Sequence, residues 1–64
     1  MDKASLIARK HEVIAQIVRV RRELERERQH PSKKHKRKRE QLERQLERLM
    51  AEEYRLRLQI DRSR

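Results

Sequence analysis

The sequence predicts an all-α fold, an antiparallel two-helix coiled-coil hairpin, and three observations lead to it. The 64 residues include no Gly, Cys, Phe or Trp and a single Pro, so the usual ingredients of tight β turns, sheets and disulfide frameworks are missing. Apolar residues recur with heptad spacing on both sides of that proline. Because so short a chain forms one domain at most, we expect a single helical hairpin over residues 1–64.

The first helix is expected at about residues 3–29. Asp2 is a plausible N-cap, and good helix formers follow it with no internal Gly or Pro. Lys10 takes the one polar slot of the apolar seam along this helix. The predicted seam residues are Leu6, Val13, Ile17, Val20 and Leu24.

Pro31 predicts the break between the helices, because proline cannot continue a helix and disfavours helical geometry at His30 before it. We expect a basic turn at about residues 30–33, with Ser32 as a possible cap, and a second helix at about 33–61. The second seam also has one polar member, Glu53. Its apolar members are Leu42, Leu46, Leu49, Leu56 and Ile60.

The two seams predict the register of the hairpin. Folding the chain back at residue 33 pairs residues whose numbers sum to 66, and every seam residue of one helix then faces a seam residue of the other. Lys10 and Glu53 fall in neighbouring layers of this arrangement. We expect them to form an ion pair that sets the register, the alternative being that each side chain extends to water.

The two flanks of the predicted seam differ in polarity. One flank is polar, whereas a lone hairpin would leave the other exposed as an apolar flank, consisting of Ile7, Ile14, Val18, Met50 and Tyr54. This flank predicts a protein partner. Our first choice is a second copy of the chain, giving a homodimer that forms a four-helix bundle, and the alternative is a different helical protein.

Most of the net charge of +9 lies in the middle of the chain. Residues 28–39 contain seven basic residues and no acidic one, and the arms on either side are nearly neutral. A cluster of this density binds phosphates without reading a base sequence, so nucleic acid, DNA or RNA, is the predicted ligand. A solvated basic turn or an acidic protein partner is the alternative, and a membrane surface is disfavoured. The predicted phosphate contacts are Arg28, Lys33, Lys34, Lys36, Arg37, Lys38 and Arg39.

The sequence gives no sign of an active site. There is no Cys, and His30 and His35 are interpreted as solvated histidines rather than metal ligands. His11 is interpreted as a boundary residue of the apolar flank. The alternation of glutamates with Arg44 and Arg48 is typical of exposed helix faces supported by ion pairs. We therefore expect no enzyme activity, no catalytic residues, no metal, no cofactor and no small-molecule substrate.

No apolar run of membrane-spanning length and no secretory signal are present, so we expect a small soluble intracellular protein, cytoplasmic, or nuclear if eukaryotic. In layout alone the hairpin is similar to plasmid RNA-binding hairpins, to the small two-helix protein of the large ribosomal subunit and to hairpin co-chaperones of bacterial secretion systems. The leading hypothesis is a non-enzymatic nucleic-acid-binding or ribonucleoprotein subunit. The alternative is an adaptor or co-chaperone that works through the apolar flank.

Overall fold

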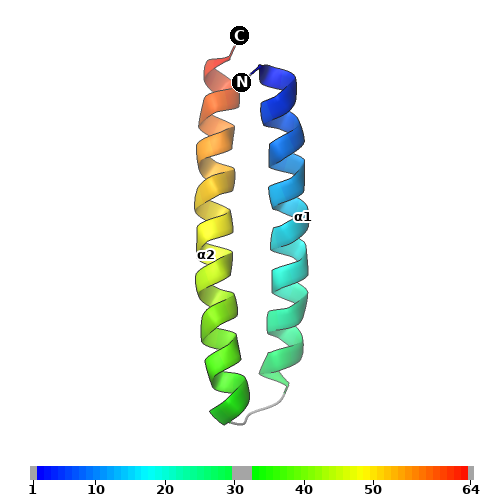
Figure 1. Ribbon diagram of the computed structural model, residues 1–64, viewed down its shortest axis with the longest axis vertical. Coiled ribbons are helices and arrows are strands. Elements are labelled where there is room, and N and C mark those ends of the chain that lie inside the picture. Colours follow the sequence, from blue (N-terminus) through cyan, green and yellow to red (C-terminus); the bar gives the residue numbers. More distant parts are fainter. Residues whose placement is uncertain (1, 30–32, 64) are drawn as a thin grey trace.

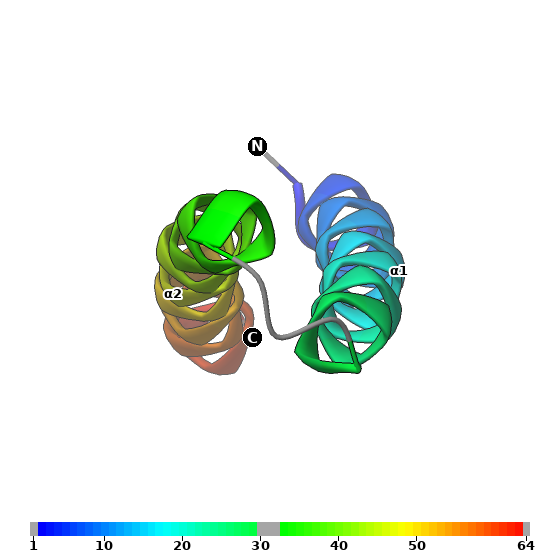
Figure 2. The same cartoon turned by 90° about the horizontal axis from the view of Figure 1, so that it is seen from below.

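The structure, a computed structural model, describes residues 2–29 and 33–63 and consists of two antiparallel α-helices, as predicted (Figure 1). Helix α1 spans Lys3–Arg28 and helix α2 spans Lys33–Arg62, against expected ranges of 3–29 and 33–61. Together they form a rod of 49 × 14 × 13 Å in which the helices cross at a shallow angle (Figure 2). The predicted break at His30 and Pro31 and the candidate cap Ser32 lie outside the described residues.

Helix α1 has defined caps at both ends. The Asp2 carboxylate accepts a hydrogen bond from the backbone N–H of Ser5 at 3.0 Å, which satisfies one of the donors that a helix start leaves free. The side chain and backbone N–H of Ser5 together hold the pKa of Asp2 below its ordinary value. At the other end the N–H of Gln29 donates to the carbonyl of Arg26 at 3.2 Å. The N-cap assigned from the sequence is therefore the observed one.

The core is the heptad seam. Val13, with 0% exposure, lies at its centre, and Leu46 and Ile60 are partly buried at its edge. Side chains at heptad spacing lie on one stripe of each helix, so packing two such stripes together removes them from water. The fully buried members are Leu6, Val13, Ile17, Val20, Leu24, Leu42, Leu49 and Leu56.

The predicted ion pair between Lys10 and Glu53 is not formed among the described residues, where both side chains are half-buried. The ion pair that crosses the helices here lies one position earlier, on the polar flank. Arg9 donates to Oε1 of Glu52 from Nη2 at 2.8 Å and from Nε at 3.0 Å. A half-buried lysine can lay its aliphatic stem along the seam and keep its ammonium in water, which is less costly than burying the charge.

Arg9 is held from two sides, because its Nη1 also lies 3.1 Å from Oε2 of Glu12 in the same helix. The hydrogen bonds to Glu52 and Glu12 raise the pKa of Arg9 above its ordinary value. A planar guanidinium that bonds the other helix through two nitrogens is sensitive to the lengthwise position of the helices. Arg9 and Glu52 therefore form the cross-helix ion pair that the sequence assigned to Lys10 and Glu53.

Neither helix, over its described residues, has an apolar stretch long enough to cross a lipid bilayer.

Candidate nucleic-acid interface

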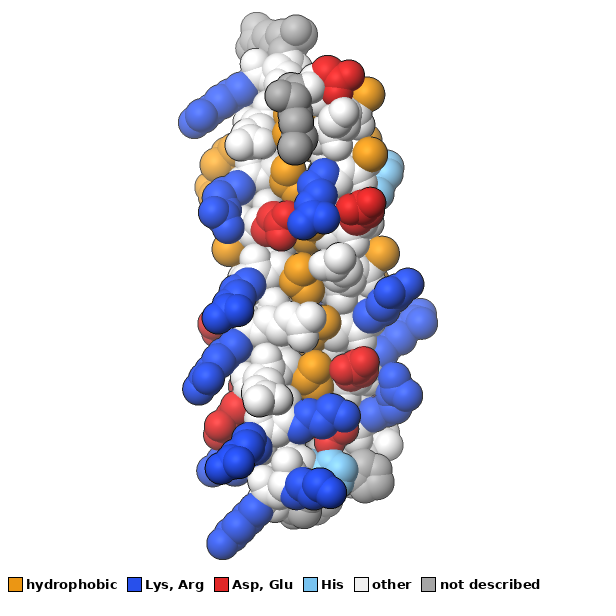
Figure 3. All heavy atoms as spheres, viewed as in Figure 1, with side chains coloured by type: hydrophobic (Ala, Val, Ile, Leu, Met, Phe, Trp, Pro, Cys, Tyr) orange, Lys and Arg blue, Asp and Glu red, His pale blue; other side chains and the backbone are white. Residues whose placement is uncertain are grey.

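Six of the seven predicted phosphate contacts lie at the start of helix α2 rather than in the turn. We call the basic residues of this segment, 33–39, the basic cluster. Helix α2 begins at Lys33, so residues 33–39 wind through almost two helical turns and point their charges in several directions. Exposed cations of the cluster are Lys33, Lys34, Lys36, Arg37 and Lys38, whereas Arg39 is half-buried. Basic side chains crowd this end of the molecule in the space-filling view (Figure 3).

One carboxylate, Glu27 in the last turn of α1, reaches into this cluster. Its side chain is only 12% exposed, and Oε1 lies 3.2 Å from Nζ of Lys38. Its other oxygen, Oε2, forms a hydrogen bond with Nδ1 of His35. The bonds from His35 and Lys38 lower the pKa of Glu27, outweighing the partial burial that acts in the opposite direction. Glu27 thereby fastens the start of α2 to the end of α1.

The remaining cations of the predicted site divide into paired and unpaired groups. Arg28 lies 3.7 Å from the carboxylate of Glu25, a loose ion pair within α1. Among the described residues, four exposed cations of the cluster have no ion pair. These four, which we call the free cations, are Lys33, Lys34, Lys36 and Arg37.

Glu27 was missed in the sequence, and the interpretation of His35 as a solvated histidine was wrong. The heptad contained the signal, since Glu27 lies three residues after Leu24 and His35 lies seven before Leu42. Both positions therefore continue the seam toward the turn. The other histidine of that interpretation, His30, lies outside the described residues, and His11 is exposed.

The free cations lie at an unfavourable place in the helix. The first turn of α2 contains no acidic residue, although the N-terminal end of a helix carries a partial positive charge that favours anions. Lys33, Lys34 and Lys36 therefore repel both one another and the helix dipole. The unpaired N–H groups of a helix start also point toward any anion bound there. This arrangement favours the binding of a phosphate.

The apolar flank lies away from this end. Ile14, Val18, Met50 and Tyr54 are exposed, and Ile7 is half-buried. The structure adds Leu58, four residues after Tyr54 and therefore on a neighbouring part of the same helix surface. Exposure of these five large side chains ranges from 37% at Leu58 to 57% at Tyr54. The predicted partner for this flank stays a prediction.

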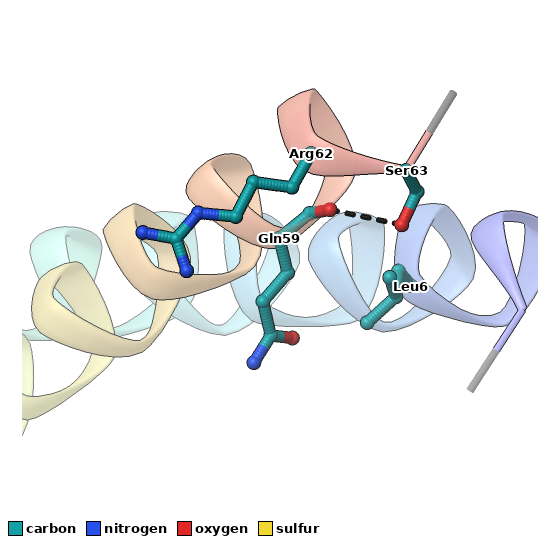
Figure 4. Close-up of a pocket in the computed structure, with 4 residues that line it drawn as sticks. All are labelled: Leu6, Gln59, Arg62 and Ser63. Atoms are coloured by element: carbon teal, nitrogen blue, oxygen red, sulfur yellow. Dashed lines mark hydrogen bonds between the residues drawn. The ribbon is translucent and has the colours of Figure 1, made fainter.

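A shallow hollow of about 410 Å³ lies at the opposite end of the rod, lined by Leu6, Gln59, Arg62 and Ser63 (Figure 4). The Ser63 hydroxyl donates to the carbonyl of Gln59 at 3.0 Å, so it serves the end of α2. Over the described part of the chain, no three His, Asp or Glu side chains are grouped so as to hold a metal ion.

The expected ion pairs along α2 are also not formed. Neither Arg44 nor Arg48 takes part in an ion pair in the part of the chain that the structure describes. The guanidinium groups of both residues are exposed.

No protein-family model matches this chain, and no curated protein or solved structure shows a significant similarity to it. The class that the fold and the cluster define is thus a basic helical hairpin, and its function rests on the geometry alone.

Proposed function

We propose that the protein is a non-enzymatic nucleic-acid-binding hairpin whose basic cluster at the start of α2 contacts phosphates. The observation that carries the proposal is the set of four free cations, Lys33, Lys34, Lys36 and Arg37, at the positive end of a helix dipole. Glu27, which reaches into the cluster from α1, is bonded to His35 and Lys38. Among the described residues, no carboxylate forms an ion pair with any of the four free cations.

Phosphate is the anion that suits this cluster. Lys and Arg side chains that neutralise several phosphates release condensed counterions, which makes a cluster on one helical end a salt-sensitive ligand for a polyanion. The contribution of base stacking is small, because Tyr54, the only aromatic residue, lies in the other half of α2. We therefore expect binding that depends on the phosphate backbone and not on base sequence.

Fluorescence anisotropy against salt concentration, with short DNA and RNA duplexes, tests this proposal. The variant Lys33→Gln/Lys34→Gln/Lys36→Gln removes three of the free cations. Its matched control, Lys3→Gln/Arg21→Gln/Arg57→Gln, removes the same charge from exposed positions outside the cluster. Glutamine keeps a long helix-forming side chain, so circular dichroism should show both variants folded.

We expect the slope of log affinity against log salt to fall by about 2 to 3 in the cluster variant and by less than about 1 in the control. The proposal would be contradicted if wild type bound only at low salt and the two variants had equal slopes. Binding would then come from nonspecific attraction by the net positive charge and not from the cluster.

A second candidate function is supported by the exposed apolar flank. Five large exposed apolar side chains on a small rod favour a protein partner. The partner is either a second copy of the chain or, if the protein is an adaptor or co-chaperone, a different protein. Ile14→Glu should abolish such an association, measured by sedimentation equilibrium and by pull-down, while leaving polyanion binding by the monomer in place. If wild type and Ile14→Glu are both monomeric and capture nothing, the flank has no partner role.

A further inference from the structure

Helix α2 carries a row of basic residues along its whole outer face. The row advances by alternating steps of three and four residues, which keeps its members on one side of a helix. The intervening positions at the same spacing are Gln41, Ala51 and Leu58, so no acidic residue interrupts it. We call this row the arginine stripe, and its members are Lys34, Arg37, Arg44, Arg48, Arg55 and Arg62.

The side chains of the arginine stripe are available for a ligand. All six are exposed, and none of them forms an ion pair within residues 2–29 and 33–63. Arg55 donates only to the carbonyl of Ala51 in its own helix, at 3.4 Å. Figure 3 shows basic side chains along the outer edge of α2 from one end of the rod to the other.

The acids of α2 do not neutralise this face. Glu52 is bonded to Arg9 of the other helix, and Glu53 is half-buried beside the seam. Glu40, Glu47 and Asp61 lie on an adjoining edge of the helix at multiples of seven residues, with Tyr54 at the position between Glu47 and Asp61. The row itself therefore holds six basic residues and no acidic one, with Gln41, Ala51 and Leu58 at the positions between them.

Resting on the proposed function, we propose that the arginine stripe is a second phosphate-binding surface, continuous with the basic cluster, and that the ligand is a double-helical nucleic acid lying along α2. Lys34 and Arg37 belong to both surfaces and join them. The cluster alone would contact a few phosphates at one point, whereas cluster and stripe together follow a backbone.

The dimensions of the stripe favour a duplex. Lys34 and Arg62 are separated by about 42 Å along a straight helix axis, at about 1.5 Å per residue, which is close to the length of about 12 base pairs at about 3.4 Å each. A rigid row of charges suits a ligand whose phosphates are themselves held in a rigid array. A flexible single strand is held mainly by stacking on aromatic rings, and the arginine stripe has none.

The shape of the rod also predicts how the duplex is contacted. A single α-helix, about 10–12 Å across with its side chains, fits the major groove of B-DNA. Here α2 is packed against α1 along its length, so only its outer side, which carries the arginine stripe, is free to approach a duplex (Figure 2). Lys and Arg contacts to phosphates carry no sequence information, so we expect no preference for base sequence.

The test measures salt-dependent binding of the full chain to a 24-base-pair DNA duplex, a 24-base-pair RNA duplex and a single strand of 24 thymidines. The stripe variant is Arg44→Gln/Arg48→Gln/Arg55→Gln, and its control is Lys3→Gln/Arg21→Gln/Arg57→Gln, which removes the same charge away from the stripe. A third variant, Arg44→Lys/Arg48→Lys/Arg55→Lys, keeps the charge. Circular dichroism verifies that each variant is helical.

On at least one duplex we expect the stripe variant to reduce the slope of log affinity against log salt by about 2.7, while the control changes it by less than about 1. The loss of affinity between 50 and 200 mM salt then becomes about 40-fold smaller in the stripe variant than in wild type. The Lys variant should retain the wild-type slope. Comparison of the two duplexes shows whether DNA or RNA is preferred.

The two proposals fail differently. If wild type binds and the cluster variant loses binding, but the stripe variant matches its control, the arginine stripe is not a binding surface and the proposed function stands. Tighter binding of the thymidine strand than of either duplex would overturn the choice of a double helix. Absence of wild-type binding to all three ligands near physiological salt would overturn both proposals.

Discussion

The two ends of the hairpin are held together by different interactions. From Leu6 to Leu24, helix α1 contributes apolar side chains to the seam, and they are buried against α2. At the next seam position toward the turn stands Glu27, which holds α2 through His35 and Lys38. The apolar part brings the helices together by removing surface from water, whereas the turn end is fastened by polar bonds and leaves cations exposed.

This comparison separates stability from binding along the length of the rod. Apolar burial is strong and is not screened by salt as charge interactions are, so the seam tolerates an unfavourable charge cluster at its end. Locally unfavourable features concentrate at functional sites, because the rest of the fold compensates for them. The basic cluster at the start of α2 fits that description. The following predictions test whether the two ends differ as this comparison requires.

The largest effect is expected in the apolar seam. Leu49→Ala removes a buried side chain and leaves a cavity, and such changes cost about 2–5 kcal/mol. In a domain of this size the loss corresponds to a fall in melting temperature of about 10–30 °C. Leu58→Ala is the matched control, because the same substitution there removes a side chain that is 37% exposed. Equal melting temperatures for the two variants would show that the seam is not the source of stability.

The next effect has the opposite sign. Lys33→Glu/Lys34→Glu places acids in the first turn of α2, where the helix dipole and the neighbouring cations both favour negative charge. We expect the melting temperature to rise by about 3–8 °C while affinity for a duplex falls at least about tenfold. Thermal denaturation and anisotropy on the same samples measure both. A variant that loses stability as well as binding would contradict the view that these lysines are kept for a ligand.

A smaller effect is expected at the start of α1. Asp2→Ala removes the acceptor of the Ser5 N–H, and loss of an N-cap lowers the melting temperature of a small domain by about 4–8 °C. Asp2→Ser should retain most of the wild-type value, because serine is also a good cap. Affinity for nucleic acid should be the same in all three proteins. A change in affinity would mean that the two ends are coupled.

The smallest effect is expected in the dependence of stability on pH. Because the pKa of Glu27 is lowered in the folded chain, its contribution is fully present above the range in which free carboxyls titrate, about pH 4 to 4.5, and is lost as the pH falls through the folded pKa. The same sign holds for Asp2. Melting temperatures measured from pH 6 to pH 3 should therefore fall, and they should fall less steeply in Glu27→Gln. An identical pH profile for wild type and Glu27→Gln would show that this carboxylate does not fasten the turn end.

Much of the fold was predictable because, in a long amphipathic helix, the spacing of the apolar residues shows which side of the helix is buried. The seam residues and the cap at Asp2 followed from that spacing and from local chemistry alone. The polar contacts were less predictable. Lys10 and Glu53 were assigned an ion pair by register, but the length and flexibility of such side chains leave several partners within reach.

The sequence by itself determined an all-helical hairpin, its antiparallel pairing and the concentration of cations near the turn. These properties depend on periodicity and composition, which are readable along the chain. Only the tertiary structure decided that Arg9 bonds Glu52 and that Glu27 bonds His35 and Lys38. It also decided that Arg44, Arg48 and Arg55 are exposed and not paired with the glutamates near them in the sequence. The physical reason is that a charged side chain at the surface has several possible partners, in its own helix and in the other one. The tertiary geometry determines which of them it bonds.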